Sequence, residues 1–262
     1  MGNYSLQNIK SAYQQKKIWE RQFPLNYFLI RPLSFYVTYL VIRITSNPAK
    51  IATFGFILGV LGCFSLTLIS FCTIWPGLFL ILLYSLSDAV DGNVARTTQN
   101  VTLFGKYLDG LLGDLIEGIY PFSLAIGLYL SDNAVNSDFV VAFAKEHAKA
   151  LPLLLGALIL ICKLWSKLFE RGYDHYHIRK EGFTPVAKTN LQKPFEKSKY
   201  SHQWYYLLFI NLDSLNNQLL LLTIFILLKL EIWFLFMFAM FYFFKAVLSF
   251  IYYFIKTRSL LL

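Results

Sequence analysis

The chain has 262 residues, of which 56% are hydrophobic and only 15% are charged. Its apolar residues come in long runs rather than in alternation, which excludes an ordinary soluble domain. In such a chain the formal net charge of +9 indicates membrane topology and attraction to anionic lipids, not nucleic-acid binding.

Two segments precede the first predicted span. Residues 1–24 are rich in Lys and Arg and are predicted to be cytoplasmic. Residues 25–46 are apolar enough for a span, but Arg31 and Arg43 interrupt the run, together with Pro32. A charge at mid-bilayer costs about 3 kcal/mol on insertion scales. The mixture of Arg and aromatic residues therefore favours an amphipathic helix that lies in the membrane interface.

Long apolar segments with few charges follow, and about 18 or more such residues in a row predict a membrane-spanning helix. Six segments fit this description: 51–73, 76–98, 101–130, 150–168, 204–228 and 231–256. The long polar connection, residues 169–203, is again rich in Lys and Arg. We therefore predict an all-α integral membrane protein in which six transmembrane helices and the N-terminal interfacial helix form a single membrane domain, residues 1–262.

The basic residues predict the orientation. With six spans, residues 1–24, residues 169–203 and the C-terminal end with Lys256 and Arg258 all fall on one side of the membrane. The positive-inside rule makes that side cytoplasmic, so a multi-pass protein with both termini in the cytoplasm is expected. The absence of an apolar core in residues 1–24 argues against a signal peptide and favours a bacterial inner membrane.

Four aspartates stand out where the second predicted span ends and the third begins: Asp88, Asp91, Asp109 and Asp114. Asp88 and Asp91 fall in the last turns of one span, and Asp109 falls in the first turns of the next. Because the two spans are antiparallel neighbours, these three carboxylates are expected to meet near the cytoplasmic interface. Helical spacing also predicts two faces that combine carboxylates with small residues. The faces are Asp88, Asp91, Gly92, Ala95 and Arg96, and Gly105, Asp109 and Gly113.

Three facing carboxylates repel one another at low dielectric unless they take up protons or share a cation. Ligands that offer only oxygen favour a hard divalent cation such as Mg²⁺, Mn²⁺ or Ca²⁺ over zinc. Arg96, on the same face, suits a ligand phosphate. Solvated helix ends capped by Asp are the simpler alternative, but they do not explain why small residues and an arginine share the faces.

The run Asp88-x2-Asp91-Gly92-x2-Ala95-Arg96-x8-Gly105-x3-Asp109 resembles the motif of the CDP-alcohol phosphotransferase family, D-x2-D-G-x2-A-R-x8-G-x3-D-x3-D. Every fixed position except the last matches without a gap. The resemblance implies transfer of a substituted phosphate from a CDP-alcohol, with CDP-diacylglycerol the leading donor, to a hydroxyl acceptor in phospholipid synthesis. The resemblance also implies that CMP is released, and the basic segments predict that the active site lies on the cytoplasmic side.

The resemblance also assigns roles to residues. It implies that Mg²⁺ or Mn²⁺, as two ions, binds to Asp88, Asp91 and Asp109. It implies that the cytidine and phosphate pocket is lined by Gly92, Ala95, Arg96 and Gly105. The resemblance further implies that the protein forms a homodimer. Three alternatives remain: a soluble CDP-alcohol that donates to a lipid or a lipid-linked glycan, a non-catalytic nucleotide- or lipid-binding descendant, and, less favoured, a transporter or channel.

The last aspartate of the motif is replaced here by Gly113, and Asp114 is next to it. In a regular α-helix Asp114 lies about 100° around from the expected face. A π-bulge between residues 109 and 114 would restore its alignment. Alternatively, Glu117 could serve from a turn further along, or no residue replaces the aspartate. The bulge is favoured, which makes Asp114 a metal ligand and the general base, with Asp109 and Glu117 as further catalytic candidates.

Overall fold

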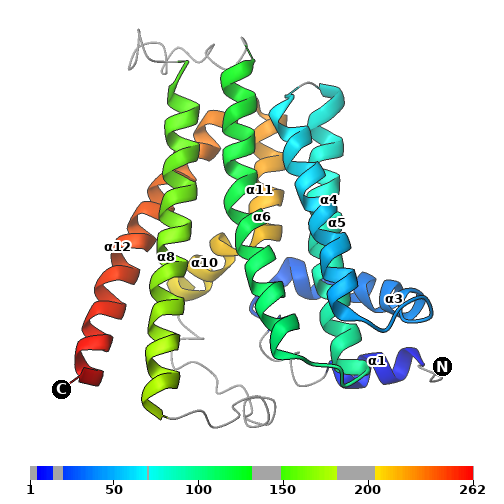
Figure 1. Cartoon of the computed structure of the whole chain (residues 1–262). Helices are drawn as coiled ribbons and strands as arrows, with labels where there is room; N and C mark the ends of the chain where they lie inside the picture. The colour runs from blue at the N-terminus through cyan, green and yellow to red at the C-terminus, as the bar shows by residue number, and fades with distance from the viewer. Residues whose placement is uncertain (1–4, 14–19, 70, 132–148, 182–203, 262) are drawn as a thin grey trace. The chain divides into compact units, whose positions relative to one another are not determined.

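The computed structural model describes residues 5–13, 20–69, 71–131, 149–181 and 204–261, and throughout these residues the fold is helical, with no strand (Figure 1). The elements in chain order are α1 Leu6–Ala12, the π-helical segment η1 Asn26–Ile30, α3 Arg31–Val41, α4 Pro48–Thr67, α5 Phe71–Thr97, α6 Leu103–Leu130, α8 Leu151–Glu181, α10 Trp204–Asp213, α11 Leu215–Leu227 and α12 Glu231–Leu261. The predicted all-α class is confirmed. Much of the predicted basic connection, residues 182–203, lies outside the described residues.

Several helices are long and apolar enough to cross a membrane. Five such segments lie in the described residues: Pro48–Thr67, Cys72–Thr97, Tyr107–Leu130, Leu151–Tyr173 and Glu231–Arg258. The predicted fifth span, 204–228, consists instead of two helices whose axes differ by 76°, so the part of the chain that the structure describes has five candidate spans, or six if the bent pair is one. The chain is thus a multi-pass membrane protein.

The bend between α10 and α11 follows from the polar residues around it. Asn217 Nδ2 donates to the Asn211 carbonyl at 3.0 Å and to its side-chain oxygen at 2.8 Å. Gln218 Nε2 donates to the Leu212 carbonyl at 2.8 Å. A break in a helix frees backbone carbonyls, which are costly in an apolar environment unless another group satisfies them. The amide side chains supply these hydrogen bonds and stabilise the bend.

Contacts along the chain divide it into two compact units. The first unit comprises residues 1–62, 78–113 and 187–223, and the second comprises residues 63–77, 114–186 and 224–262. Helix α6 therefore gives its first residues to the first unit and the rest to the second. That the whole chain forms one membrane domain stays a prediction.

In the first unit, α4 and α5 pack closely. A Cβ atom on Gly55 would lie 2.6 Å from the Ser87 hydroxyl oxygen, so only glycine allows this approach. Ser87 Oγ donates to the Ile51 carbonyl at 3.1 Å. Helix α4 begins with a well-formed cap, because Asn47 Oδ1 accepts from the Ala49 N–H at 3.0 Å and Pro48 occupies the first helical position. The position of α4 beside the end of α5 is therefore well defined.

The predicted helix over residues 25–46 is realised as η1 followed by α3, and α3 is too short to span a bilayer. Arg31 is buried and pairs with Glu20, which also accepts a hydrogen bond from the Tyr13 hydroxyl. The Arg31 guanidinium also donates to the Ala89 carbonyl of α5 at 3.3 Å. Figure 1 shows α1 and α3 crosswise to α4 and α5, near one end of this pair. Whether α3 lies in the membrane interface stays a prediction.

The second unit contains α8 and α12, together with the part of α6 from Asp114 onward. Helices α6 and α8 approach closely where a Cβ atom on Gly156 would lie 2.4 Å from the Ala125 methyl group. Aromatic residues extend the packing, since the rings of Phe169 and Phe250 lie 5.2 Å apart. Helix α8 continues to Glu181, well beyond the end of the predicted span at residue 168.

Candidate functional site

The connection between α5 and α6 brings the aspartates together. Helix α5 ends at Thr97, and α6 begins at Leu103. Gln99, just after α5, has a φ angle of 54°, which reverses the chain at the helix end. Thr102 then caps α6, because its hydroxyl oxygen accepts from the Gly105 N–H at 3.0 Å. This short connection holds the two helices antiparallel, with the last turns of one beside the first turns of the other.

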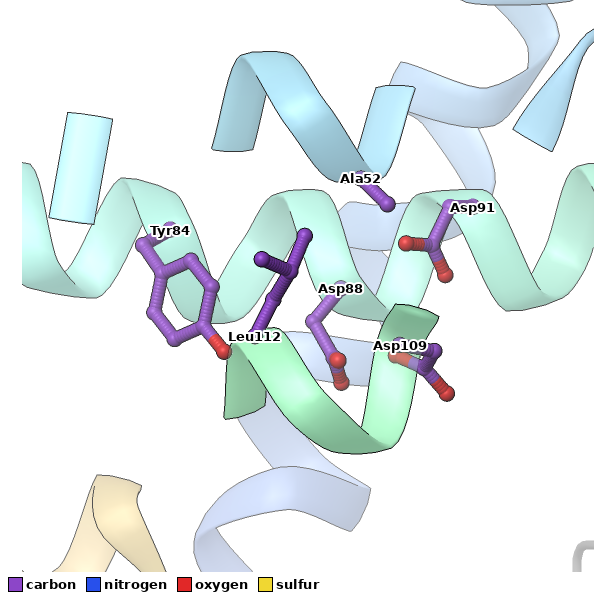
Figure 2. A pocket seen from close by; sticks show the side chains of 6 residues that line it. All are labelled: Ala52, Tyr84, Asp88, Asp91, Asp109 and Leu112. Atoms are coloured by element: carbon purple, nitrogen blue, oxygen red, sulfur yellow. The ribbon is translucent and has the colours of Figure 1, made fainter. Parts of the chain in front are cut away.

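Asp88 and Asp91 on α5 and Asp109 on α6 form a cluster. One carboxylate oxygen from each residue lies within 4.8 Å of the others, and the carboxylates of Asp88 and Asp109 are exposed while Asp91 is buried (Figure 2). A hard cation binds oxygen at about 2.0–2.6 Å, so ligands on one ion lie up to about 5 Å apart. The three oxygens therefore fit a shared Mg²⁺ or Mn²⁺ ion, and the helical spacing correctly predicts that they converge.

The cluster faces a small open hollow of about 190 Å³ in the first unit. Its lining, drawn in Figure 2, consists of Ala52, Tyr84, Asp88, Asp91, Asp109 and Leu112. This volume includes space that is open to solvent, so the hollow is a partly open depression and not an enclosed ligand cavity.

Arg96 lies one turn beyond this cluster and folds back over Gly92. A Cβ atom on Gly92 would lie 3.2 and 3.3 Å from the two terminal nitrogens of the guanidinium, so any other residue there would displace it. Arg96 Nη2 donates to Asn93 Oδ1 at 3.0 Å. Asn93 in turn donates to the hydroxyl oxygens of Ser34 at 3.0 Å and Thr38 at 3.2 Å. Helix α3 therefore fixes the asparagine that orients Arg96.

The Arg96 guanidinium keeps donor capacity. Its Nε is buried and has no hydrogen-bond partner among the described residues. A guanidinium binds phosphate through several parallel N–H groups, and an unused buried donor carries a cost until a ligand satisfies it. Ala95 is half-buried beside Arg96, and the Gly105 N–H is already used in capping α6. The arrangement suits an anionic ligand next to the carboxylates.

Asp114 and Glu117 have different surroundings from the cluster. Asp114 pairs with Arg171 and lies 3.8 Å from Lys167 Nζ. Glu117 pairs with the buried Lys163 at 3.0 Å. Helix α6 is α-helical from Leu103 to Leu130, so the expected π-bulge is absent from it. The regular geometry leaves Asp114 off the face of Asp109, and neither Asp114 nor Glu117 joins the three-carboxylate group.

Sequence reasoning missed two residues of the site. Tyr84 lines the hollow, and its hydroxyl oxygen lies 3.7 Å from the place of a Cβ atom on Gly113. Asn93 connects Arg96 to α3. A signal existed for Tyr84, which precedes Asp88 by one helical turn and so shares its face. Asn93 gave none, because its partners come from a distant segment.

These observations define a class: a multi-pass helical membrane protein with a carboxylate cluster and an arginine suited to a divalent cation and a phosphate. Residues 46–166, which contain the cluster and Arg96, match the family model for CDP-alcohol phosphatidyltransferase. An uncharacterized protein of Aquifex aeolicus (strain VF5) is 31% identical over 152 residues, which cover 53% of this chain and 73% of that protein. The chain belongs to the CDP-alcohol phosphatidyltransferase family. Enzymes of this family transfer phosphate from a CDP-alcohol to an acceptor and are generally metal-dependent.

Proposed function

We propose that this protein transfers a phosphatidyl group from CDP-diacylglycerol to the hydroxyl of a small polar acceptor, with release of CMP, as a step of phospholipid synthesis. The observation that carries the proposal is the convergence of the three carboxylates to within 4.8 Å beside a phosphate-compatible arginine. In this reaction the acceptor oxygen forms a bond to phosphorus while the bond to CMP breaks.

Asp88, Asp91 and Asp109 would hold two Mg²⁺ or Mn²⁺ ions. Bound divalent cations neutralise the charge of a pyrophosphate and orient it for in-line displacement. The residues of this chain supply the remaining contacts. Arg96 would bind a phosphate oxygen of the donor, and Gly92 keeps that guanidinium close to the helix. Ala95 and Gly105, which leave space beside their helices, would border the cytidine.

A lipid donor is supported by exposed aromatic residues on α6, the helix that carries Asp109. Phe104 is 66% exposed and Tyr107 is 60% exposed, and both lie within the first two turns of that helix. Exposed aromatic side chains are typical of the membrane interface, where one side of a residue contacts acyl chains and the other contacts water. A donor with a lipid tail and a charged headgroup matches both environments.

The acceptor hydroxyl must lose its proton, and we propose Asp109 as the group that takes it. Asp109 is exposed and lines the hollow. Asp114 and Glu117 remain candidates for this role, and for Asp114 also as a metal ligand, but their carboxylates pair with Arg171 and Lys163 respectively. Neither of these two residues lines the hollow, whereas Asp109 does, so Asp109 is the candidate that an acceptor in the hollow would reach.

The topology of the enzyme is also proposed. The active site and both termini would face the cytoplasm at a bacterial inner membrane, which the positive charge of the basic segments favours. We also propose a homodimer, because the resemblance to the family implies one. Cysteine labelling of residues 24 and 258 from each side of sealed vesicles tests the orientation.

The decisive experiment is CMP release by purified protein in proteoliposomes with Mg²⁺ or Mn²⁺. CDP-diacylglycerol is compared with CDP-choline, CDP-ethanolamine and CDP-glycerol as donors. The acceptors are glycerol, glycerol 3-phosphate, myo-inositol and serine, with diacylglycerol for the soluble donors. Asp91→Asn is expected to abolish release, and Glu231→Gln, which removes a carboxylate at the start of α12, serves as the matched control.

Three outcomes separate the alternatives. Release from CDP-diacylglycerol supports the proposal. Release only from a soluble CDP-alcohol reverses the roles of donor and lipid acceptor. Binding of Mn²⁺ without release from any donor supports the non-catalytic descendant, for which Gly113 in place of an aspartate is the motivating feature.

A further inference from the structure

We propose that the Tyr84 hydroxyl binds the hydroxyl group of the acceptor and positions it for attack, in the space that Gly113 leaves open. This inference rests on the proposed transferase function and identifies the acceptor side of the site. It is carried by the position of Tyr84 in the hollow, by the surroundings of Gly113, and by the direction that an in-line displacement requires.

Tyr84 belongs to the same helical face as the aspartates of α5. Asp88 follows it by four residues and Asp91 by seven, so all three side chains line one hollow. Figure 2 shows the Tyr84 ring beside α5 with its hydroxyl group directed toward α6. The residue as a whole is 5% exposed, so the ring is held in place by its neighbours, and its hydroxyl oxygen lies beside Gly113.

Gly113 lies on the facing helix one turn after Asp109, and the space beside it is open. A Cβ atom built on Gly113 would meet one heavy atom within 4 Å among the described residues, the Tyr84 hydroxyl oxygen at 3.7 Å. A phenol at the edge of this space offers a hydrogen-bond donor and an acceptor without adding negative charge to three carboxylates. The space is therefore suited to a neutral hydroxyl group.

The order of groups along α5 assigns the two ends of the site. Arg96 follows Asp91 by five residues, whereas Tyr84 precedes it by seven. The carboxylates thus lie between the arginine and the phenol. In an in-line displacement the attacking and leaving oxygens lie on opposite sides of phosphorus. Because Arg96 and its small neighbours suit the leaving nucleotide, the attacking hydroxyl approaches from the end that holds Tyr84.

The role of Tyr84 is hydrogen bonding. The acceptor oxygen forms the new bond to phosphorus, CMP leaves with the electrons of the broken bond, and the acceptor proton passes to the Asp109 carboxylate. The Tyr84 hydroxyl keeps its own proton throughout, and it holds the acceptor oxygen by one hydrogen bond.

The test measures steady-state kinetics with CDP-diacylglycerol and the acceptor from the panel above that best supports CMP release. Tyr84→Phe should lower kcat/KM for the acceptor by about tenfold, which corresponds to one lost hydrogen bond. Its KM for CDP-diacylglycerol and its Mn²⁺ affinity, measured by electron paramagnetic resonance, should not change. Tyr36→Phe, which removes the hydroxyl group of an exposed tyrosine on α3, is the matched control.

Residue 113 provides a second, independent pair of variants. Gly113→Leu fills the open space and should remove acceptor-dependent CMP release while leaving Mn²⁺ affinity intact. Gly113→Ala brings its methyl group only to ordinary contact distance from Tyr84 and should lower release less than Gly113→Leu does.

Each contrary result has a distinct meaning. A Tyr84→Phe variant with the acceptor kinetics of the wild type overturns this inference, and so does a Gly113→Leu variant that retains full release. Loss of Mn²⁺ affinity in Tyr84→Phe also overturns it, because the phenol would then serve the cation site. Failure of the wild-type protein to release CMP with any donor overturns the proposed function itself.

Discussion

Helix α6 carries two groups of carboxylates with opposite surroundings. Near its start, Asp109 lies against Asp88 and Asp91 of α5. Further along, Asp114 and Glu117 are each matched with cations of α8, which are Lys163, Lys167 and Arg171. The same residue type on one helix thus occurs once with like charges as neighbours and once with opposite charges.

The difference teaches which group serves a ligand. Carboxylates that crowd together raise the free energy of the empty protein, and a site retains such a cost where a ligand relieves it. Carboxylates paired with cations are satisfied by the fold. Lys163 has a side chain only 1% exposed and also lies 5.0 Å from the Tyr242 ring centroid. The first group is therefore the functional candidate, and the second is part of the packing.

The largest expected effect separates the two groups by activity. Asp91→Asn removes a ligand of the proposed cation site and should lower CMP release by about 1,000-fold. Asp114→Asn should lower it far less, because Asp114 is expected to hold Arg171 and not the substrate. Loss of release in both variants, with normal Mn²⁺ binding in Asp114→Asn, would break the comparison and make Asp114 the general base.

The next effect concerns stability and reverses the order of the groups. Glu117→Gln leaves Lys163 buried without its counter-charge and should destabilise the protein by about 3 kcal/mol. The measurement is thermal unfolding in detergent. Asp91→Asn removes repulsion and is expected to unfold at or above the wild-type temperature. The double variant Glu117→Leu with Lys163→Met controls for charge, and it should recover most of the lost stability.

A smaller effect tests how Arg96, the arginine next to the first group of carboxylates, is held in position. Arg96 is oriented by a hydrogen bond from its guanidinium to Asn93. Asn93→Ala should raise KM for CDP-diacylglycerol by about tenfold through this one contact. Mn²⁺ affinity should stay unchanged, since Asn93 is not part of the carboxylate group. An unaltered KM in Asn93→Ala would contradict the positioning role, and Asn216→Ala, which removes a buried amide at the start of α11, is the control.

The smallest effect concerns a hydrogen bond in the first unit, between the Tyr13 hydroxyl and the Glu20 carboxylate. Burial, followed by the hydrogen bond to Glu20, raises the pKa of the Tyr13 hydroxyl above its ordinary value. The folded protein therefore keeps this proton when the unfolded chain loses it above about pH 10, so stability should fall as the pH rises beyond that value. Tyr13→Phe should lose about 1 kcal/mol at neutral pH. It should also show a shallower decline of the unfolding temperature above pH 10, and a decline as steep as that of the wild type would refute this assignment.

The N-terminal segment shows where local reasoning stops. The interruption of an apolar run by Arg31 and Arg43 predicts correctly that residues 25–46 do not form a long spanning helix. Sequence could not foresee that Arg31 is buried against Glu20 and the Ala89 carbonyl. Burial of an arginine depends on partners that only tertiary folding brings near it.

Sequence by itself determined the helical membrane class, the approximate spans and the convergence of Asp88, Asp91 and Asp109. These features follow from local hydrophobicity, helical spacing and a short connection, all of which act within one or two neighbouring helices. Tertiary structure decided which cations pair with Asp114 and Glu117, where residues 204–228 bend, and that Tyr84 and Asn93 join the site. For the cation pairs and for Asn93, the physical reason is that the partners come from segments far apart in the chain, whose meeting no local pattern encodes. For the bend and for Tyr84, the pattern of hydrophobic residues does not report which side chains form hydrogen bonds or line a hollow.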